Sequence, residues 1–224
     1  MIIFIYDKGI LKYFNKKIYF PIKMTMTFIS EGWEGVVYKI NEYTVCKIGF
    51  KDIMINEYNN FKLLPNKAPI MNLSSVILKN SDKNINDLQD SVILRSIFDH
   101  IKTNDNQWLH DNLKNFISID TFDTTLYEIH MPFIQGKSLD KIDKFTFSLK
   151  ESLFVLYEQM KELNEIDGIF HNDLNLGNIM YNEENDIITI IDWGYMSLNT
   201  PLKIMFEHPI KTDLERIMLI IDSI

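Results

Sequence analysis

Three polar side chains lie at spacings that suit phosphoryl transfer. Asn178 follows Asp173 by five positions, and Asp192 follows Asp173 by nineteen, directly after the apolar run Ile187–Ile191. A carboxylate can accept the proton of an attacking hydroxyl, while an amide oxygen and a second carboxylate can bind the magnesium ion that bridges nucleotide phosphates. The spacing lets one loop and one short hairpin deliver all three groups. The pattern therefore predicts a phosphoryl-transfer site.

The apolar periodicity of the second half predicts the elements that must hold these residues. Apolar residues recur at helical spacing through Phe147–Ile166, and Gly168 follows as a stop signal. Short strands are expected at Ile179–Tyr181 and Ile187–Ile191, on either side of a turn. A last helix is expected to begin near Thr212. The loop that carries Asp173 thus lies between a long helix and a hairpin.

The first half is richer in β-favouring residues. Runs of this kind occupy 18–20, 24–29, 36–40, 44–48, 75–78, 116–119 and 126–131. The last two runs are expected to pair with each other. Helical spacing begins at Asp52, which we interpret as an N-cap, and ends at Pro65; the segments 92–101 and 108–116 also have helical patterns. The order predicts an α+β fold.

Composition limits the classes of function. The 224 residues suit one domain or one domain of two lobes, and a net charge of −8 with no basic stripe argues against binding nucleic acid. Cys46 is the single cysteine, so no intramolecular disulfide can form, which suits a reducing compartment. No apolar run reaches the length of a membrane span. We therefore expect a cytoplasmic protein, and delivery into a host cell is compatible with that expectation.

A glycine-containing turn and a strand lysine precede the expected helix that ends at Pro65. The segment Ser30–Val37 fits the pattern G-x-G-x-x-G-x-V with Ser30 at the first glycine position. Glycines let backbone N–H groups approach phosphates, although such a turn alone is more often a plain hairpin. Its candidate nucleotide contacts are Ser30, Gly32, Gly35 and Val37. Lys47 on the next strand and Glu57 on the following helix could form an ion pair.

The loop His171–Asn178 resembles the catalytic loop of the protein-kinase-like superfamily, and Asp192-Trp193-Gly194 is similar to its metal-binding Asp-Phe-Gly. The resemblance implies that Asp173 is the catalytic base and that Asn178 and Asp192 bind Mg²⁺. It also implies a bilobal protein-kinase-like fold with a β-rich N-lobe and a truncated α-helical C-lobe.

Further segments share the resemblance. Val45-Cys46-Lys47 resembles the strand that ends in the phosphate-binding lysine, so Lys47, paired to Glu57, would hold the α- and β-phosphates of ATP. The segment from Met131 resembles the hinge, where Met131 and Phe133 are adenine contacts or core residues. Asp213 resembles the aspartate that braces the catalytic loop, but an ordinary first-turn aspartate explains it equally well.

The chain also departs from the family pattern. Asn172 replaces the usual arginine before the catalytic aspartate, which argues against control by phosphorylation of the activation segment. The Asp-Leu-x-x-Gly-Asn form of the loop is similar to aminoglycoside and choline kinases. Only 30 residues follow Gly194, however, and this shortness resembles the minimal kinases that pathogenic bacteria use as effectors.

These observations predict one kinase-like domain: an N-lobe over 1–131, a hinge over 132–136 and a minimal C-lobe over 137–224. Residues 66–114 form an insertion that either binds a regulatory partner or packs on the first lobe. The expected function is an ATP- and Mg²⁺-dependent Ser/Thr protein kinase with a protein substrate. The alternatives are a small-molecule kinase of the aminoglycoside or choline type and a pseudokinase that acts as a binding module.

Overall fold

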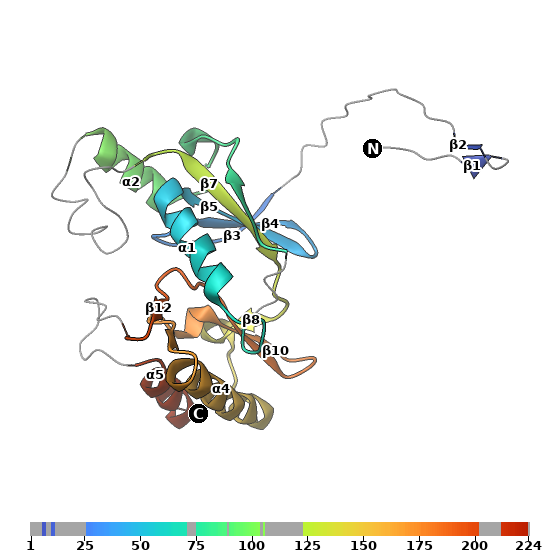
Figure 1. Cartoon of the computed structure of the whole chain (residues 1–224), viewed down its shortest axis with the longest axis vertical. Helices are drawn as coiled ribbons and strands as arrows, with labels where there is room; N and C mark the ends of the chain where they lie inside the picture. Colours follow the sequence, from blue (N-terminus) through green and yellow to red (C-terminus); the bar gives the residue numbers. More distant parts are fainter. Residues whose placement is uncertain are drawn as a thin grey trace.

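The fold has a β-rich part and a helical part, which lie one above the other in Figure 1. The computed structural model describes residues 6–7, 10–11, 26–70, 75–88, 90–103, 105, 123–201 and 212–223. The β-rich part contains a five-stranded sheet, whereas the two helices near the C-terminus dominate the other part. The predicted α+β class, with a β-rich first lobe and a helical second lobe, is confirmed.

The sheet of the first lobe is antiparallel throughout and places Lys47 on its central strand. Its strands follow the order β3 (Thr27–Glu31), β4 (Val36–Asn41), β5 (Thr44–Phe50), β7 (Leu126–Pro132) and β6 (Ile77–Asn80). Lys47 lies opposite Val37 on one side and Ile129 on the other. Directly opposite residues share a face of a sheet, so these three side chains point to the same side.

Helix α1 (Lys51–Leu63) follows β5 without a connecting loop. Its N-cap is Phe50, which makes no side-chain cap hydrogen bond, so the prediction that Asp52 is the N-cap is wrong. Because β5 continues to Phe50, Asp52 lies inside the first turn, where a carboxylate favours the helix dipole. The immediate strand-to-helix transition fixes the rotation of α1 and turns Glu57 toward the sheet.

Residues 75–88 and 90–103 of the insertion pack on the first lobe, whereas residues 66–70 contact the second lobe, where Ile70 bridges Ile190 and Lys67 pairs with Glu162. Strand β6 extends the sheet two residues later than predicted, and η1 (Ile85–Asp87) and α2 (Val92–Lys102) follow. Leu94 and Ile97 of α2 are completely buried, and the Glu31 carboxylate of β3 accepts hydrogen bonds from the Ser91 hydroxyl and the Ile93 N–H. The predicted elements at 18–20, 108–116 and 116–119 lie outside the described residues, as does any pairing of 116–119 with β7.

The second lobe is built on α4 (Phe147–Glu165), within one residue of its predicted end. The Thr146 hydroxyl caps this helix, and α5 (Asp213–Asp222) packs against it. Short strands cover its other side. They are β8 (Lys137–Ser138), β10 (Ile179–Asn182) and β11 (Ile187–Ile190) in one sheet, and β9 (Ile169–Phe170) with β12 (Ser197–Leu198) in another. A separate ribbon pairs β1 (Tyr6–Asp7) with β2 (Ile10–Leu11).

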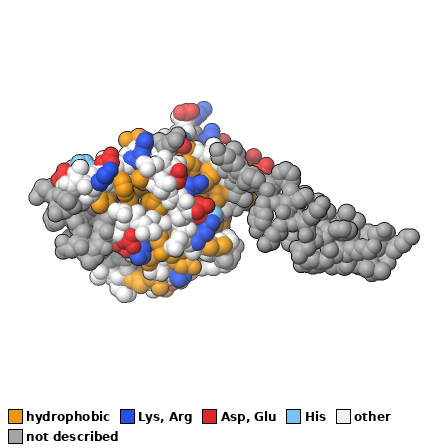
Figure 2. Space-filling model, turned by 90° about the horizontal axis from the view of Figure 1, so that it is seen from above, with side chains coloured by type: hydrophobic (Ala, Val, Ile, Leu, Met, Phe, Trp, Pro, Cys, Tyr) orange, Lys and Arg blue, Asp and Glu red, His pale blue; other side chains and the backbone are white. Residues whose placement is uncertain are grey.

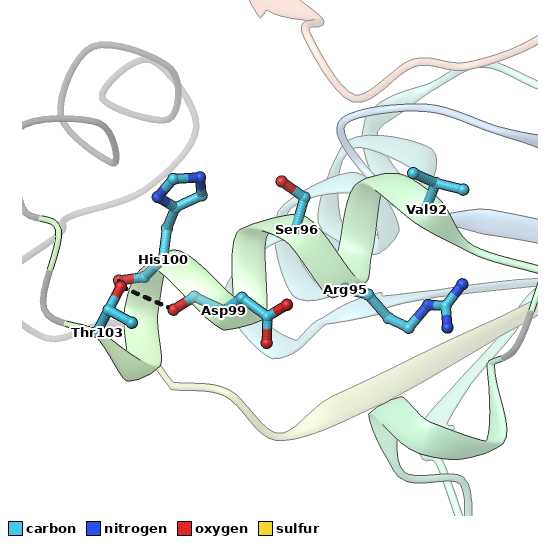
Figure 3. A pocket seen from close by; sticks show the side chains of 6 residues that line it. All are labelled: Val92, Arg95, Ser96, Asp99, His100 and Thr103. Carbon is cyan, nitrogen blue, oxygen red and sulfur yellow. Dashed lines mark hydrogen bonds between the residues drawn. The ribbon is translucent and has the colours of Figure 1, made fainter.

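Charged side chains of both signs are mixed on the surface. On the face shown in Figure 2, basic and acidic side chains alternate over the described residues. A hollow along α2 is lined by side chains of that helix and its C-cap (Figure 3): Val92, Arg95, Ser96, Asp99, His100 and Thr103. Among the described residues, no helix is both long and apolar enough to cross a membrane.

Candidate active site

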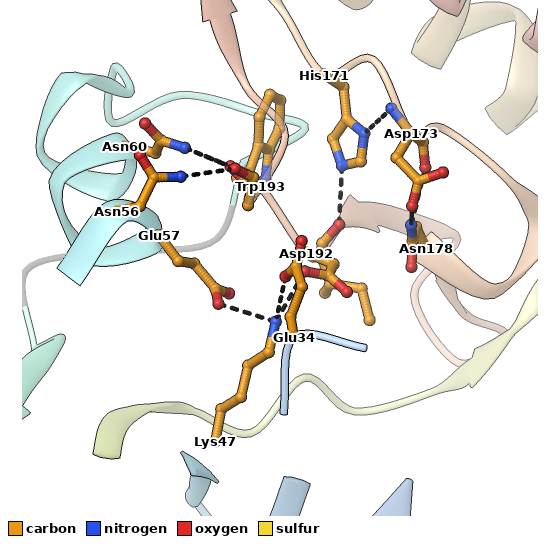
Figure 4. A network of polar contacts seen from close by, with 12 residues as sticks. Glu34, Lys47, Asn56, Glu57, Asn60, His171, Asp173, Asn178, Asp192 and Trp193 are labelled. Carbon is orange, nitrogen blue, oxygen red and sulfur yellow. Dashed lines mark hydrogen bonds and ion pairs between the residues drawn. The ribbon is translucent and has the colours of Figure 1, made fainter. Parts of the chain in front are cut away.

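The Lys47 ammonium is the centre of a buried ionic cluster (Figure 4). Its Nζ lies 2.8 Å from a carboxylate oxygen of Glu34, 2.8 Å from one of Glu57 and 2.9 Å from one of Asp192. The predicted ion pair between Lys47 and Glu57 is therefore present. Lys47 is only 5% exposed, and the three surrounding carboxylates raise its pKa against the opposing effect of burial. Segments far apart in sequence thus converge on one cation.

The glycine-containing turn closes on itself beside this cluster. The Gly32 N–H donates to the Gly35 carbonyl at 2.9 Å, and the Gly35 N–H donates back at 3.3 Å, so both amides are satisfied within the turn. A Cβ on Gly35 would lie 2.6 Å from the Ile48 carbonyl oxygen, whereas Gly32 has open space. Gly35 is therefore required for close packing on β5. Ser30 pairs with Val37, the residue opposite Lys47.

Glu34 is the site residue that sequence reasoning missed. It occupies a variable position of the turn, where a charged side chain is expected to be solvated, yet it is only 7% exposed and contacts Lys47. Burial raises its pKa well above the usual value, despite the opposing charge of Lys47. Its carboxylate packs against Gly194, where a Cβ would lie 2.3 Å from Glu34 Oε1. No sequence pattern distinguishes this inward turn from a solvated one.

Asp192 has the properties of a cation ligand. Its φ of 64° is in the left-handed region, which is uncommon for residues other than glycine and is frequent at functional sites. Burial would raise its pKa, but the charge of Lys47 and the hydrogen bond from Lys47 hold the pKa at about 2. The side chain keeps 37% exposure, so an ionised carboxylate remains accessible to solvent.

Asp173 and Asn178 face each other across one turn of the loop. The Asn178 amide nitrogen donates to the Asp173 carbonyl at 2.8 Å and to its Oδ2 at 3.0 Å. This leaves the amide oxygen of Asn178 as its acceptor end. Burial raises the pKa of Asp173, and the nearby charge of Asp192 adds to the shift. A carboxylate with a raised pKa is a better proton acceptor, as a general base requires.

The loop backbone is braced from the second lobe. The Asp213 carboxylate, 3% exposed, accepts the N–H of His171 at 2.8 Å and the N–H of Asn172 at 3.0 Å. The bracing interpretation of Asp213 is therefore confirmed. Completely buried His171 contacts the Ile191 carbonyl through Nε2 at 3.0 Å and packs edge-on against Trp193, so it links the loop to the Asp192 segment.

Asn172 takes a structural role at the position where the family usually has arginine. Its φ is 68°, a conformation that asparagine tolerates better than most residues. Its amide donates to the Tyr195 carbonyl at 2.7 Å and to the Ser197 hydroxyl at 2.9 Å. The loop is therefore tied directly to the segment after Asp192, without a phosphate-binding arginine at this position.

The two candidate adenine contacts of the predicted hinge segment lie at the end of β7. Met131 is half-buried opposite Val45, and the Phe133 N–H donates to the Tyr43 carbonyl at 2.9 Å. The Lys39 ammonium lies 4.0 Å from the centre of the Phe133 ring. Neither residue has a polar contact with the Lys47 cluster among the contacts of the described residues. Their role as adenine contacts stays a prediction.

Two groups of side chains in the described residues have the composition of a metal site. In the first, carboxylate oxygens of Glu34, Glu57 and Asp192 lie within 4.8 Å of one another, and such hard oxygen donors suit Mg²⁺. The second group, on the opposite face of the sheet, contains Cys46, Glu128 and His130. There Lys79 already neutralises Glu128 at 2.7 Å, so the first group fits a cation better.

Parts of this chain are similar to known proteins. A model of a phosphotransferase enzyme family matches residues 136–203, which include Asp173, Asn178 and Asp192. Mitogen-activated protein kinase 12 of Danio rerio is 34% identical over 93 residues, 38% of this chain. A probable choline kinase 3 of Arabidopsis thaliana is 43% identical over 51 residues, 23% of this chain. These partial matches support a relation to the protein-kinase-like superfamily.

The similarity of this chain to known proteins is partial. The chain spans a quarter of the length of the zebrafish kinase and 14% of the plant protein. The structure of the Cydia pomonella granulovirus kinase PK-1 aligns with this structure with a TM-score of 0.44 and 16% identity, over 77% of this chain and 53% of that one. The sequence matches thus support a kinase-like phosphotransferase.

Proposed function

We propose that this protein transfers a phosphoryl group from ATP to hydroxyl groups of a protein, as a minimal Ser/Thr kinase that uses Mg²⁺. The observation that carries the proposal is the convergence of Glu57 and Asp192 on Lys47, beside the hydrogen-bonded pair Asp173 and Asn178. This is the set of groups that phosphoryl transfer needs: a cation for the phosphates, oxygens for a metal ion and a proton acceptor.

Each predicted residue has a place in this proposal. Lys47, held by Glu57, would bind the α- and β-phosphates, and Ser30, Gly32, Gly35 and Val37 would lie over the nucleotide. The oxygens of Asp192 and Asn178 would hold Mg²⁺. When bound, this ion neutralises phosphate charge. Met131 and Phe133 would contact the adenine.

The Asp173 carboxylate would orient and deprotonate the attacking hydroxyl. As the new oxygen–phosphorus bond forms, the bond from the γ-phosphorus to the bridging oxygen breaks, ADP leaves, and the hydroxyl proton passes to Asp173. The contact with Asn178 and the brace from Asp213 fix the carboxylate, which limits the entropy lost on reaching the reactive geometry.

Asp192→Ala tests the proposed chemistry. With radiolabelled ATP and a cell lysate, we expect label transfer to fall by at least about 100-fold, because a ligand of the ion that would neutralise the reacting phosphates is lost. Asp140→Ala, at an exposed position of η3 (Leu139–Lys141), is the matched control and should keep wild-type transfer. Circular dichroism should show both variants folded. Wild-type transfer by folded Asp192→Ala would rule out the mechanism.

A small-molecule kinase is the second candidate, favoured by the match to a phosphotransferase enzyme family and by the similarity to a choline kinase. The same experiment separates the two candidates when choline and an aminoglycoside are offered beside the lysate proteins. Label on protein that disappears with Asp173→Ala supports the protein kinase, and label on a small molecule supports the alternative. ATP binding without any transfer would indicate a binding module.

A further inference from the structure

Three carboxylates surround the Lys47 ammonium at contact distance. Lys47 donates hydrogen bonds to Glu34 at 2.8 Å and to Asp192 at 2.9 Å, and Glu57 Oε2 lies 2.8 Å away as an ion-pair partner outside hydrogen-bond geometry. A phosphate oxygen that approaches the ammonium meets these three carboxylates, and one of them must withdraw to make room for it. The carboxylate that withdraws most easily is the one that is held least firmly.

Glu34 is the acceptor that can leave with the least rearrangement. Glu57 is 1% exposed in the middle of α1, so its withdrawal would require the helix to move. Asp192 has the proposed role of metal ligand and can stay beside Lys47. Glu34 lies in the turn between β3 and β4, and short turns move more readily than packed helices.

Glu34 also packs against Gly194 of the second lobe. Both carboxylate oxygens lie so close to Gly194 that a Cβ there would come within 2.3 and 2.4 Å of them. The absent side chain of Gly194 thus makes room for the Glu34 carboxylate between Lys47 and the segment after Asp192. This position, next to the phosphate-binding lysine and the metal ligand, is also where a phosphate of the proposed nucleotide would need to lie.

We propose that Glu34 competes with the nucleotide phosphates for Lys47, so that the turn lowers the affinity of the site for nucleoside di- and triphosphates. This inference rests on the proposed function, because it requires a nucleotide at Lys47. Like charge adds to the competition, since a phosphate that approached Lys47 beside Glu34 would face a carboxylate across a short distance. Release of Glu34 then becomes part of nucleotide binding.

Calorimetric titration of full-length Glu34→Ala and wild-type protein with MgADP, MgATP and adenosine tests the inference. We expect Glu34→Ala to bind MgADP and MgATP about tenfold more tightly or better, the effect of one hydrogen bond to a charged group. Adenosine has no phosphate, so its affinity should not change. Glu34→Gln keeps the size of the side chain and should give an intermediate gain. Glu42→Ala, an exposed glutamate of the β4–β5 turn, controls for net charge.

Each outcome decides the question. Weaker or unchanged binding of MgADP to both Glu34 variants would overturn the inference, and weaker binding would instead make Glu34 a phosphate or metal partner. Equally tighter binding of adenosine would also overturn it, because that result indicates an effect that does not depend on the phosphates. Binding by Glu34→Ala but not by wild type would support the inference in its strongest form. If neither protein binds any nucleotide, the proposed function fails as well.

Discussion

Neighbouring residues of β5 point to opposite faces of the same sheet and meet different charge environments. On one face, Lys47 contacts three carboxylates at 2.8–2.9 Å. On the other face, the Cys46 thiol donates to Glu128 at 3.5 Å, and Glu128 also contacts Lys79 at 2.7 Å and His130 at 3.3 Å. The second cluster depends on the register between β5 and β7, whereas the first joins β5 to segments outside the sheet. The Lys47 cluster has an excess of acid, and the Glu128 cluster is balanced.

The difference shows how a buried charge cluster can be assigned to stability or to function. The balanced cluster needs no further ion, since Lys79 and His130 lower the pKa of Glu128 although burial opposes this. In the Lys47 cluster, burial raises the pKa of both Glu34 and Glu57, which means that one ammonium does not fully compensate three carboxylates. Such an arrangement costs stability and suits a site that also receives a cation.

Lys47→Met should give the largest effect on both stability and activity. It leaves three carboxylates without their common partner in a place where two of them are less than 10% exposed. We expect a loss of about 3–5 kcal/mol in the free energy of unfolding, measured by urea denaturation, because breaking a buried pair leaves uncompensated charge. Phosphoryl transfer should fall by at least about 100-fold.

The double variant Lys47→Met/Glu57→Gln separates the two effects. Removing the most deeply buried of the three charges should restore part of the lost stability, whereas transfer should stay absent. If Lys47→Met alone were as stable as wild type, the charges of the Lys47 cluster would not need compensation more than those of the Glu128 cluster. The contrast between the two faces would then fail.

The cluster around Lys47 was only partly predictable from the sequence. The pairing of Lys47 with Glu57 follows from a strand that leads directly into a helix, since both residue types and the helical spacing are visible. Glu34 was not predictable, because its inward direction depends on how the turn packs on β5 and on the space beside Gly194. These are properties of the assembled lobes rather than of the local pattern.

Asp213→Asn should have an intermediate effect through the loop backbone. An asparagine oxygen can accept one of the two N–H groups of His171 and Asn172, and its NH₂ group faces the other. A buried N–H without an acceptor costs about 1–3 kcal/mol, measurable as a lower melting temperature. Because the loop positions Asp173, we expect the turnover rate to fall by up to about 100-fold while the affinity for MgADP stays unchanged.

Thr212→Ala is the matched control for this brace. Thr212 caps the same helix through the N–H of Glu215 but does not contact the loop, and its loss should cost about 1 kcal/mol without affecting turnover. Equal effects of the two variants on turnover would mean that Asp213 acts only through the stability of α5.

The brace also shows what the sequence leaves open. A first-turn aspartate can favour the helix dipole or reach another segment, and both interpretations of Asp213 fit the same residues. The choice depends on the packing of α5 against α4 and the loop, contacts between residues about 40 positions apart. In contrast, α4 was predicted to within one residue, because its apolar stripe and the glycine that follows it, Gly168, are local features.

Lys79→Met should give the smallest effect and tests the balanced face directly. Lys79 is about half exposed, and Glu128 keeps contacts with His130 and Cys46 when Lys79 is lost. An exposed ion pair contributes about 0–1 kcal/mol, so the urea midpoint should shift slightly and transfer should match wild type. A loss of stability as large as that of Lys47→Met would show that charge in the Glu128 cluster is as critical as charge in the Lys47 cluster. A small loss of stability would mean that the excess of acid, rather than burial of charge alone, distinguishes the Lys47 cluster.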